Sequence, residues 1–464
     1  MKKLEPGSVK SSGTIGISTP KLITSAITVK NSVLRLWFSA TETHGHETYL
    51  KAMREVLDVT DFDLHIHGKH SGGVSPKMEI PVIAEEAEKK GLDMVGTGDI
   101  LNPKWLRHVR EETEEKDGYL KRDNIRFIPT TEAEDEDRIH HLIIFPDLET
   151  VEEAYQDFKE LSDDIRREGR PRIQADGEKI VEIAKEHNCL IGPCHAFTPY
   201  TAIYGRKDSL EECYGEQVEN LDFLELGLSA DSEMASRISD HEDLVFLSNS
   251  DAHSPWPHRL GREFNRAELS KENFKGLRSL FTGEEGKIKL NVGLDPREGK
   301  YHCSACNSCH QKYSLEEAEN FDWSCQECSG TIKKGVNDRV NELADRESGY
   351  EVDYLHLPPL AKIIQLTVGH SSPTTKTVQK KWKAFNEEFG AEIDILIEEE
   401  IEDLAKVDEE VAESIRKFRQ DEIIMVPGGG GNYGERFLPE NDEEASEIRE
   451  EKKNQINCRY RDKK

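Results

Sequence analysis

The chain has 464 residues, a length that suggests two or three domains and allows a sizeable core. Its formal net charge of −30 lowers the expectation of nucleic-acid binding without excluding it, because a local group of Lys and Arg can outweigh the overall field. No apolar run approaches the roughly 20 residues that span a bilayer, and no compact apolar core of a signal peptide opens the sequence. We therefore expect a soluble cytoplasmic protein. Its nine cysteines, several in Cys-x-x-Cys pairs, then indicate metal ligands rather than disulfides.

Residues 1–52 form a basic, Ser/Thr-rich segment ahead of a strongly acidic remainder. The segment carries seven Lys and Arg against three Glu, so its net charge is +4. It is either a disordered extension or translation upstream of a start at Met53, and we favour the second interpretation. We assign it no function.

The first chemical motif closes an alternating run, residues 59–66, that predicts a strand. The motif reads Asp63-Leu-His-Ile-His67. Side chains two apart on a strand point to the same face, so His65 and His67 are presented together. Two neutral imidazoles side by side form a half-site for Zn²⁺ or Mn²⁺, although a single His-x-His is more often a chance surface pair.

The same pattern recurs along the chain. Short apolar runs with a His, Asp or Glu at or near one end follow at residues 92–99, 125–132, 139–145, 189–195, 221–226 and 244–253, and helices are expected at 76–90, 152–167 and 177–187. Strands alternating with helices predict a parallel sheet, and this number of units suggests a closed or nearly closed barrel. The active site of such a barrel gathers at the carboxyl ends of its strands.

This series predicts a site for several metal ions. Any one of these residues is better explained as a cap or a solvated loop residue, but a whole series of such coincidences is not. A mixed set of His and carboxylates favours Zn²⁺, Mn²⁺ or Fe²⁺ over Mg²⁺ alone. Neighbouring ions suit the hydrolysis of a phosphate ester, because one lowers the pKa of a bound water and together they hold the attacking and leaving oxygens. No Gly-rich phosphate cradle or nucleophile elbow competes with this interpretation.

Together these residues resemble the PHP domain, a distorted barrel of metal-dependent phosphoesterases. Longer motifs resemble the endonuclease Q family, whose members nick DNA on the 5′ side of deaminated bases. These motifs are Gly96-Thr-Gly-Asp-Ile-Leu-Asn-Pro-Lys-Trp105, Ile191-Gly-Pro-Cys-His-Ala-Phe-Thr-Pro-Tyr200, Glu225-Leu-Gly-Leu-Ser-Ala-Asp-Ser-Glu-Met234 and Ser248-Asn-Ser-Asp-Ala-His-Ser-Pro-Trp-Pro-His-Arg-Leu-Gly-Arg-Glu-Phe264. The resemblance covers about residues 58–436.

The resemblance implies a set of metal ligands that are also the catalytic residues, holding two or three divalent ions (Zn, Mn or Mg). Asp99 stands where many PHP proteins have a histidine, and Gly73 where other PHP families supply a ligand. His140 and His141 adjoin on one strand, so only one of them can face inward. The implied ligands are His65, His67, Asp99, Glu132, His141, His195, Asp251 and His253.

A cysteine block follows the predicted barrel. Cys306-x2-Cys309 and Cys325-x2-Cys328 have the spacing of a structural zinc ribbon, whose four thiolates leave no open catalytic position. Cys303 forms an overlapping pair with Cys306 and is an alternative ligand. The remaining cysteines of the barrel, Cys189, Cys194 and Cys213, are expected to be small buried residues.

The C-terminal part combines a basic helix with a glycine run. Ser372-Pro373 is a candidate N-cap, after which apolar residues recur at helical spacing and lysines lie mostly off that stripe. A solvated helix face and a floppy linker are the plain interpretations of the lysines and of Pro427-Gly-Gly-Gly-Gly-Asn-Tyr-Gly434. The resemblance favours DNA contacts instead, at Lys333, Lys334, Lys376, Lys380, Lys381, Gly429, Gly430 and Tyr433.

The fold class that we predict is α/β: a PHP-type distorted (β/α)7 barrel, a small four-cysteine zinc ribbon and a mainly helical C-terminal domain. The domains are residues 1–52, the extension; 58–295, the barrel; 300–345, the zinc-binding domain; 350–437, the DNA-binding domain; and 438–464, a charged disordered tail.

The resemblance implies a metal-dependent endonuclease that cuts DNA 5′ to a deaminated base such as uracil or hypoxanthine, with xanthine and abasic sites as further candidates. DNA is then the partner, and a sliding clamp or other repair proteins are further candidate partners. The alternatives are a PHP-type small-molecule phosphatase and a non-catalytic nucleic-acid-binding module. A zinc ribbon and a basic helix argue against the first, and the nearly complete ligand set argues against the second.

Overall fold

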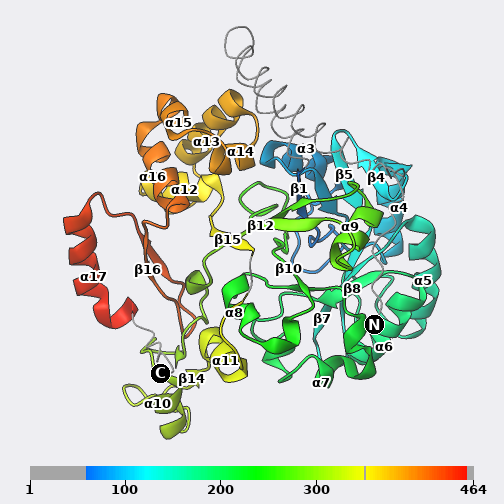
Figure 1. Cartoon of the computed structure of the whole chain (residues 1–464), viewed down its shortest axis with the longest axis horizontal. Coiled ribbons are helices and arrows are strands. Elements are labelled where there is room, and N and C mark those ends of the chain that lie inside the picture. The colour runs from blue at the N-terminus through cyan, green and yellow to red at the C-terminus, as the bar shows by residue number, and fades with distance from the viewer. Residues whose placement is uncertain (1–58, 350–351, 457–464) are drawn as a thin grey trace, which may run out of the picture. The chain divides into compact units, whose positions relative to one another are not determined.

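The computed structural model describes residues 59–349 and 352–456, so the expectations about residues 1–52 lie outside the described residues. The fold is a mixed α/β arrangement with a large central sheet (Figure 1). The strands of this sheet, in spatial order, are β15 (Asp353–His356), β12 (Lys287–Gly293), β11 (Phe264–Glu268), β1 (Val59–Asp63), β2 (Met94–Gly96), β5 (Ile125–Ile128), β4 (Tyr119–Arg122) and β3 (Glu114–Lys116).

The large sheet is parallel only in part. β1, β2 and β5 pair in parallel, as expected for strands joined through the helices α3 (Ile80–Lys90) and α4 (Pro103–Glu112). β11, however, pairs antiparallel with both β1 and β12, and β3, β4 and β5 form antiparallel pairs. The prediction of a parallel sheet is therefore wrong for these strands.

The other strands that were expected to carry site residues form two smaller sheets. β6 (Thr130–Glu134), β7 (His140–Ile144) and β8 (Leu190–Pro193) pair antiparallel, and β9 (Phe223–Glu225) pairs in parallel with β10 (Val245–Leu247). The link between β6 and β7 is too short for a crossover, so these two strands form a hairpin. The distorted barrel stays a prediction.

Helices cover these sheets with their apolar faces. α3 ends at Gly91, whose φ of 97° is the left-handed C-cap that the sequence predicts. Buried residues of α5 (Leu148–Glu160), α6 (Gly177–Glu186) and α9 (Phe274–Phe281) pack into the core, and short helices α7 (Glu211–Tyr214) and α8 (Ser232–Ser236) lie in the following loops. The helices of the described part of the chain are all too short or too polar to cross a membrane.

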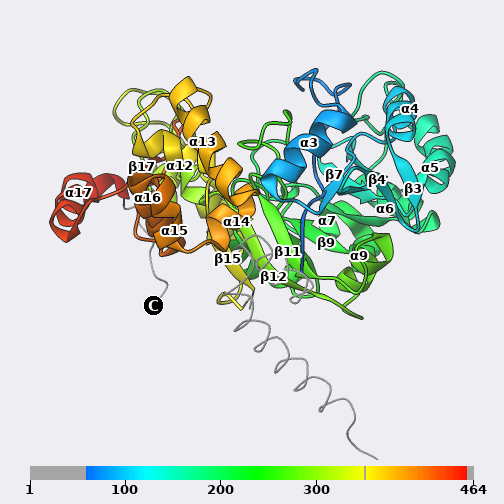
Figure 2. The ribbon, with the colours of Figure 1, turned by 90° about the horizontal axis from the view of Figure 1, so that it is seen from above.

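The cysteine block has a small core of its own, formed by Cys306, Ala318, Cys325 and Ile332, and contains β13 (Ala305–Cys306), α10 (Leu315–Asn320) and β14 (Ile332–Lys333). α11 (Val336–Leu343) follows it and packs on the main core through Val336 and Val340. The chain then returns to the large sheet, where β15 pairs in parallel with β12. A helical module follows beside β15 and β12 in both views (Figures 1 and 2). Its helices are α12 (Leu360–Thr367), α13 (Lys376–Phe389), α14 (Glu392–Ile397), α15 (Ile401–Val407) and α16 (Glu409–Arg419).

The C-terminal elements differ from expectation in three ways. α13 begins after Thr375, so the predicted N-cap at Ser372 is wrong. α17 (Asp442–Ile456) is a helix within the tail that was expected to be disordered. Residues 296–343, which contain the cysteine block, are called the zinc segment below. The hairpin of β16 (Ile424–Val426) and β17 (Glu435–Phe437) joins this segment rather than the helical module, because backbone amides of the intervening glycine run donate to carbonyls of Arg297 and Lys300.

Candidate active site

Two histidines at the end of β1 are held by carboxylates from two other strands. Nδ1 of His65 lies 2.9 Å from both carboxylate oxygens of Glu225, at the end of β9. Nδ1 of His67 lies 3.0 Å from Oδ1 of Asp99, which follows β2. A carboxylate on Nδ1 fixes the ring and leaves Nε2 to face the opposite way, the arrangement that orients metal-binding histidines.

The Nε2 atoms of both histidines point at Asp251, beyond the end of β10. Nε2 of His67 is 3.2 Å from Oδ1 of Asp251 and Nε2 of His65 is 3.9 Å from it. All three atoms are buried and have no hydrogen-bond partner. A buried polar atom without a partner costs free energy, and a divalent cation bound to all three would remove that cost. These residues therefore fit a metal ion.

A second group adjoins the first through Glu132 of β6. Oε1 of Glu132 lies 2.6 Å from Nδ1 of His140 and 3.1 Å from Nε2 of His195, and its Oε2 lies 3.3 Å from Nε2 of His67. The half-buried Arg170 donates to the same Oε2 at 3.0 Å. Glu132, His140 and His195 again form a set that could hold a metal ion, with Glu132 in contact with both sets.

His140 takes the place that the prediction gave to His141. Glu132 pairs with Leu142 and Glu134 with His140 across the β6–β7 hairpin, so His140 faces the same side as Glu132. His141 points to the other side, where its Nδ1 meets the hydroxyl of Tyr214 at 2.9 Å and its Nε2 meets Asp135 at 3.1 Å. The predicted set is corrected accordingly: alternation along the strand allows only one of the two neighbours to reach the group.

The remaining predicted residues lie around these groups. Asp99 contacts Nδ1 of His67 and the backbone N–H of Gly68, so it orients the His67 ring. His253 lies at the rim with a side chain 40% exposed, its ring centroid 4.7 Å from that of His67. Gly73 has open space around its Cα and supplies nothing to the group.

Three site residues have backbones in the left-handed region. The φ angles of Asp99, His195 and Asp251 are 49°, 31° and 46°. This conformation is costly for a residue with a side chain and persists where the surrounding structure enforces it, often at active sites. Close backbone packing accompanies it at Asp99, since a Cβ on the neighbouring Gly98 would lie 2.2 Å from the carbonyl oxygen of Ile66.

The site is electrostatically matched to cations. Burial disfavours protonation of His65, but the charges of Glu225, Glu132 and Asp251 outweigh it and raise its pKa to about 9. Glu132 is buried, yet its neighbours His140, His195 and His67 hold its pKa well below the usual range. Protons and divalent cations therefore compete for the same nitrogen atoms.

Two of the residues that the prediction missed, Glu225 and Arg170, had different signals in the sequence. Glu225 ends a short apolar run, the same signal that identified the other strand ends. Arg170 lies in a loop without any such pattern, and only the fold brings its guanidinium to Glu132.

The four predicted zinc-ribbon cysteines do come together. The Sγ atoms of Cys306 and Cys328 are 3.5 Å apart, as are those of Cys309 and Cys325. Four sulfurs around a tetrahedral Zn²⁺ with bonds of 2.3 Å lie about 3.8 Å apart, so the cluster fits such an ion. Cys303, the alternative ligand, is not in this cluster; its backbone pairs with Gly429 instead.

The residues expected to bind DNA fall into three places. Lys376 and Lys380 are exposed on α13, whereas Lys381 forms an ion pair with Asp408. Lys333 and Lys334 line a pocket beside α11. Gly429 and Gly430 are buried against the zinc segment, where a Cβ on Gly430 would lie 2.2 Å from the carbonyl oxygen of Cys306. These glycines thus serve close packing, whereas Gly431, Asn432 and Tyr433 are exposed, Tyr433 to 70%.

Comparisons with known proteins agree with this architecture. The family model for the MJ0043 C-terminal domain matches residues 359–422, the helical module. The chain is 43% identical over 277 residues to MJ0043 of Methanocaldococcus jannaschii, covering 58% of this chain but only 34% of that relative. It is 32% identical over 401 residues to YqxK of Bacillus subtilis, covering 80% of this chain and 97% of YqxK.

Two solved structures are similar over nearly their whole length. The lesion-specific endonuclease PfuEndoQ of Pyrococcus furiosus is 47% identical, with a TM-score of 0.80, covering 84% of this chain and 99% of PfuEndoQ. An endonuclease Q complexed with a 27-mer duplex carrying an abasic lesion at its active site is 48% identical, with a TM-score of 0.78, covering 82% and 97%. The fold and site thus define a DNA-cleaving hydrolase. Within that class, the chain belongs to the endonuclease Q family.

Proposed function

We propose that this protein is a metal-dependent DNA repair endonuclease that hydrolyses the phosphodiester 5′ to a damaged nucleotide. Its targets are deaminated bases, uracil and hypoxanthine with xanthine as a further candidate, and abasic sites. The observation that carries the proposal is the convergence of Nε2 of His65, Nε2 of His67 and Oδ1 of Asp251, all of them buried and none of them in a hydrogen bond. The DNA complex of a relative 48% identical supports duplex DNA as the partner.

Each residue has a defined part in this proposal. Divalent ions, when bound, would supply the Lewis acid and lower the pKa of the attacking water. Glu225 and Asp99 fix the rings of His65 and His67 through Nδ1, so that their Nε2 atoms are presented without rearrangement. Arg170 holds Glu132 in place between the two groups. Burial of these residues excludes bulk water and strengthens their electrostatic effect on a developing negative charge.

Several finer points belong to the same proposal. The strands around the site correspond to the PHP-type barrel, the four-cysteine cluster holds one structural Zn²⁺, and the enzyme acts in the cytoplasm. Exposed Lys376 and Lys380 contact the phosphate backbone, which positions the duplex without reading its sequence. The target nucleotide leaves the base stack to reach the buried groups.

The decisive experiment is a nicking assay with the full chain and Mn²⁺ or Mg²⁺. Three labelled duplexes carry one deoxyuridine, one deoxyinosine or one abasic site, and the control carries normal bases. We expect a nick immediately 5′ to the lesion, absent from the control duplex and from the His67→Ala variant. No lesion-dependent nick, together with release of phosphate from a small ester, would contradict the proposal and indicate a phosphatase.

A further inference from the structure

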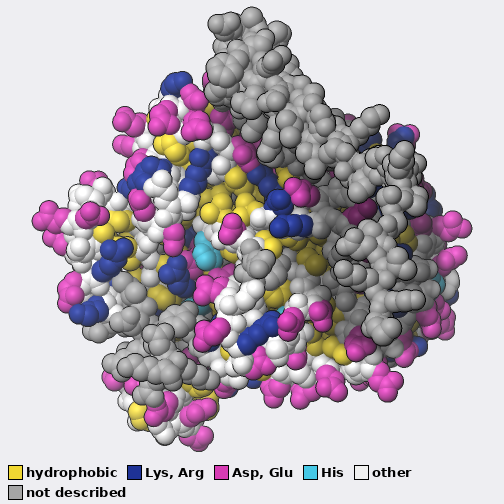
Figure 3. Space-filling view, in the orientation of Figure 1, with side chains coloured by type: hydrophobic (Ala, Val, Ile, Leu, Met, Phe, Trp, Pro, Cys, Tyr) yellow, Lys and Arg dark blue, Asp and Glu magenta, His cyan; other side chains and the backbone are white. Residues whose placement is uncertain are grey.

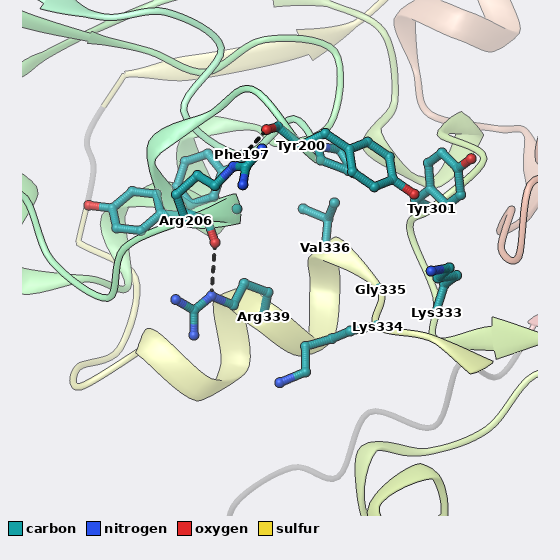
Figure 4. A pocket seen from close by; sticks show the side chains of 12 residues that line it. Phe197, Tyr200, Arg206, Tyr301, Lys333, Lys334, Gly335, Val336 and Arg339 are labelled. Carbon is teal, nitrogen blue, oxygen red and sulfur yellow. Dashed lines mark hydrogen bonds between the residues drawn. The ribbon is translucent and has the colours of Figure 1, made fainter. Parts of the chain in front are cut away.

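A pocket of about 460 Å³ opens between the loop after β8 and the zinc segment (Figure 4). Aromatic side chains reach it from the loop, and cationic side chains reach it from both sides. None of its twelve lining residues is acidic and four are Lys or Arg, although Asp and Glu make up 92 of the 464 residues of the chain. Such a departure from the overall composition points to an anionic ligand.

The aromatic component of the pocket is presented to solvent. The side chain of Tyr200 is 55% exposed, and its ring meets that of Tyr301 edge to face, with centroids 6.0 Å apart. The φ angle of Tyr200 is 84°, a conformation that is strained for a bulky residue. An exposed aromatic ring on a strained backbone is typical of a binding residue rather than of the core.

The four cations of the pocket divide into structural and available ones. Arg339 donates to the carbonyl of Tyr204, the bond from Arg339 that Figure 4 draws, and to the carbonyl of Lys207, and thereby fastens α11 to the loop. Lys334 forms an ion pair with Glu342 at 2.6 Å. Lys333 and Arg206, in contrast, form no ion pair with any carboxylate among residues 59–349 and 352–456. Arg206 uses only Nε, on the carbonyl of Tyr200, so its two terminal nitrogens remain available.

The pocket is within reach of the proposed active site. His195 and Tyr200 are five residues apart on one loop, so their Cα atoms lie at most about 18 Å from each other. Successive nucleotides of one strand rise about 3.4 Å in a duplex. A strand bound at the metal groups can therefore reach the pocket within about five nucleotides.

Resting on the proposed function, we infer that this pocket is a subsite for a nucleotide flanking the lesion. Its base stacks on Tyr200, and its phosphate lies between Lys333 and Arg206. The chemistry does not depend on base identity, because every base has a stacking face and every linkage a phosphate. The subsite thus adds affinity and fixes the register of the strand, while recognition of the lesion stays at the metal groups.

The test measures equilibrium binding of a fluorescent duplex carrying one abasic site, without added divalent ion and at several salt concentrations. Nicking by the same proteins is measured in parallel with Mn²⁺. We expect Tyr200→Ala to weaken binding about 5- to 150-fold and Tyr200→Phe to retain it. We expect Lys333→Ala to reduce the salt slope by about one and Lys333→Arg to restore it.

The matched control is Lys121→Ala, which removes an exposed lysine from β4 in the large sheet. The inference is overturned when Tyr200→Ala and Lys333→Ala bind with the affinity and salt slope of that control. If wild-type protein nicks the lesion duplex in that case, the proposed function stands and only the subsite is lost. A wild-type protein that neither binds nor nicks the duplex contradicts both the subsite and the proposed function. Melting temperatures of all variants identify a loss that is due to unfolding.

Discussion

His140 and His141 adjoin on β7 but have opposite surroundings. His140 contacts Glu132 and His195, whereas His141 bridges Tyr214 and Asp135 in the core. Removing His140 takes a candidate ligand from the site. Removing His141 leaves the buried hydroxyl of Tyr214 without its hydrogen bond, at a cost of about 1–3 kcal/mol, and takes from Asp135 one of its two partners, the other being the backbone N–H of Ile139.

We therefore predict a clean separation between the two alanine variants in nicking rate. His140→Ala should lower the single-turnover nicking rate at least about 100-fold, and it should also lower the free energy of unfolding, because Glu132 and Glu134 lose a buried partner. His141→Ala should unfold at lower denaturant but retain a rate close to that of wild type while folded. If His141→Ala lowers the nicking rate and His140→Ala does not, our assignment of the two side chains is incorrect.

Glu263, at the start of β11, is fully buried and accepts a hydrogen bond from the backbone of Leu294. Burial raises its pKa to about 8, so the folded protein holds this carboxyl group neutral at pH 7. The unfolded chain releases the proton near the usual glutamate pKa of 4.5. Folding therefore requires uptake of a proton between pH 4.5 and 8, and stability falls with rising pH across this interval.

The predicted slope is a loss of about 1.4 kcal/mol per pH unit, which ends near pH 8. The Glu263→Gln variant keeps a neutral side chain of similar shape and should lack this contribution. Urea unfolding at pH 5, 6.5 and 8 gives the difference between variant and wild type, in which the contributions of other titrating groups cancel. A difference that stays constant with pH would contradict the prediction.

At the scale of elements, the sequence predicted the short strands that end in candidate site residues, but not β3, β4, β11 or β12 of the large sheet. Alternation around His65 and His67 and the carboxylates after short apolar runs were enough for this, because those signals are local. Sheet direction was not predictable in the same way. Nothing in the run that forms β11 shows that it pairs antiparallel with β1, since direction depends on how the connecting segment is laid across the fold.

The sequence also did not decide which of two neighbouring residues faces the site. Strand alternation showed that only one of His140 and His141 could face the site, but the register that selects His140 is set by the hairpin partner β6. The glycine run was similarly ambiguous, because flexible glycines and glycines that allow close packing cannot be distinguished in a sequence. Only the contact of Gly430 with the zinc segment distinguishes them.

At the scale of the molecule, a buried ion pair joins the helical module to the catalytic part. Nζ of Lys90, on α3, lies 2.6 Å from Oε1 of Glu392, on α14, and both side chains are buried. Lys90 also donates to the carbonyl of Pro257, in the loop that follows Asp251 and His253.

Acidic side chains are widely scattered over the surface of the visible face (Figure 3).

The buried ion pair predicts that Lys90→Met is strongly destabilising, by about 3–5 kcal/mol, because it leaves Glu392 charged and unpaired in the interior. The double variant Lys90→Met/Glu392→Gln should regain part of that loss, since the amide is neutral and still accepts from Trp382. Chemical denaturation of the two single variants and the double variant completes a thermodynamic cycle. Equal unfolding midpoints for Lys90→Met and wild type would show that the pair contributes nothing.

The helical module is attached to the rest of the protein at both of its ends. β15 leads into it from the large sheet, and β16 leads out of it to pair with β17 against the zinc segment. A domain at the end of a chain is connected by a single linker and can rotate about it. A domain inserted between two anchored strands has far fewer degrees of freedom. β16 and β17 therefore act as a second attachment of the helical module. A truncation after α16 would remove this attachment and leave every helix of the module intact.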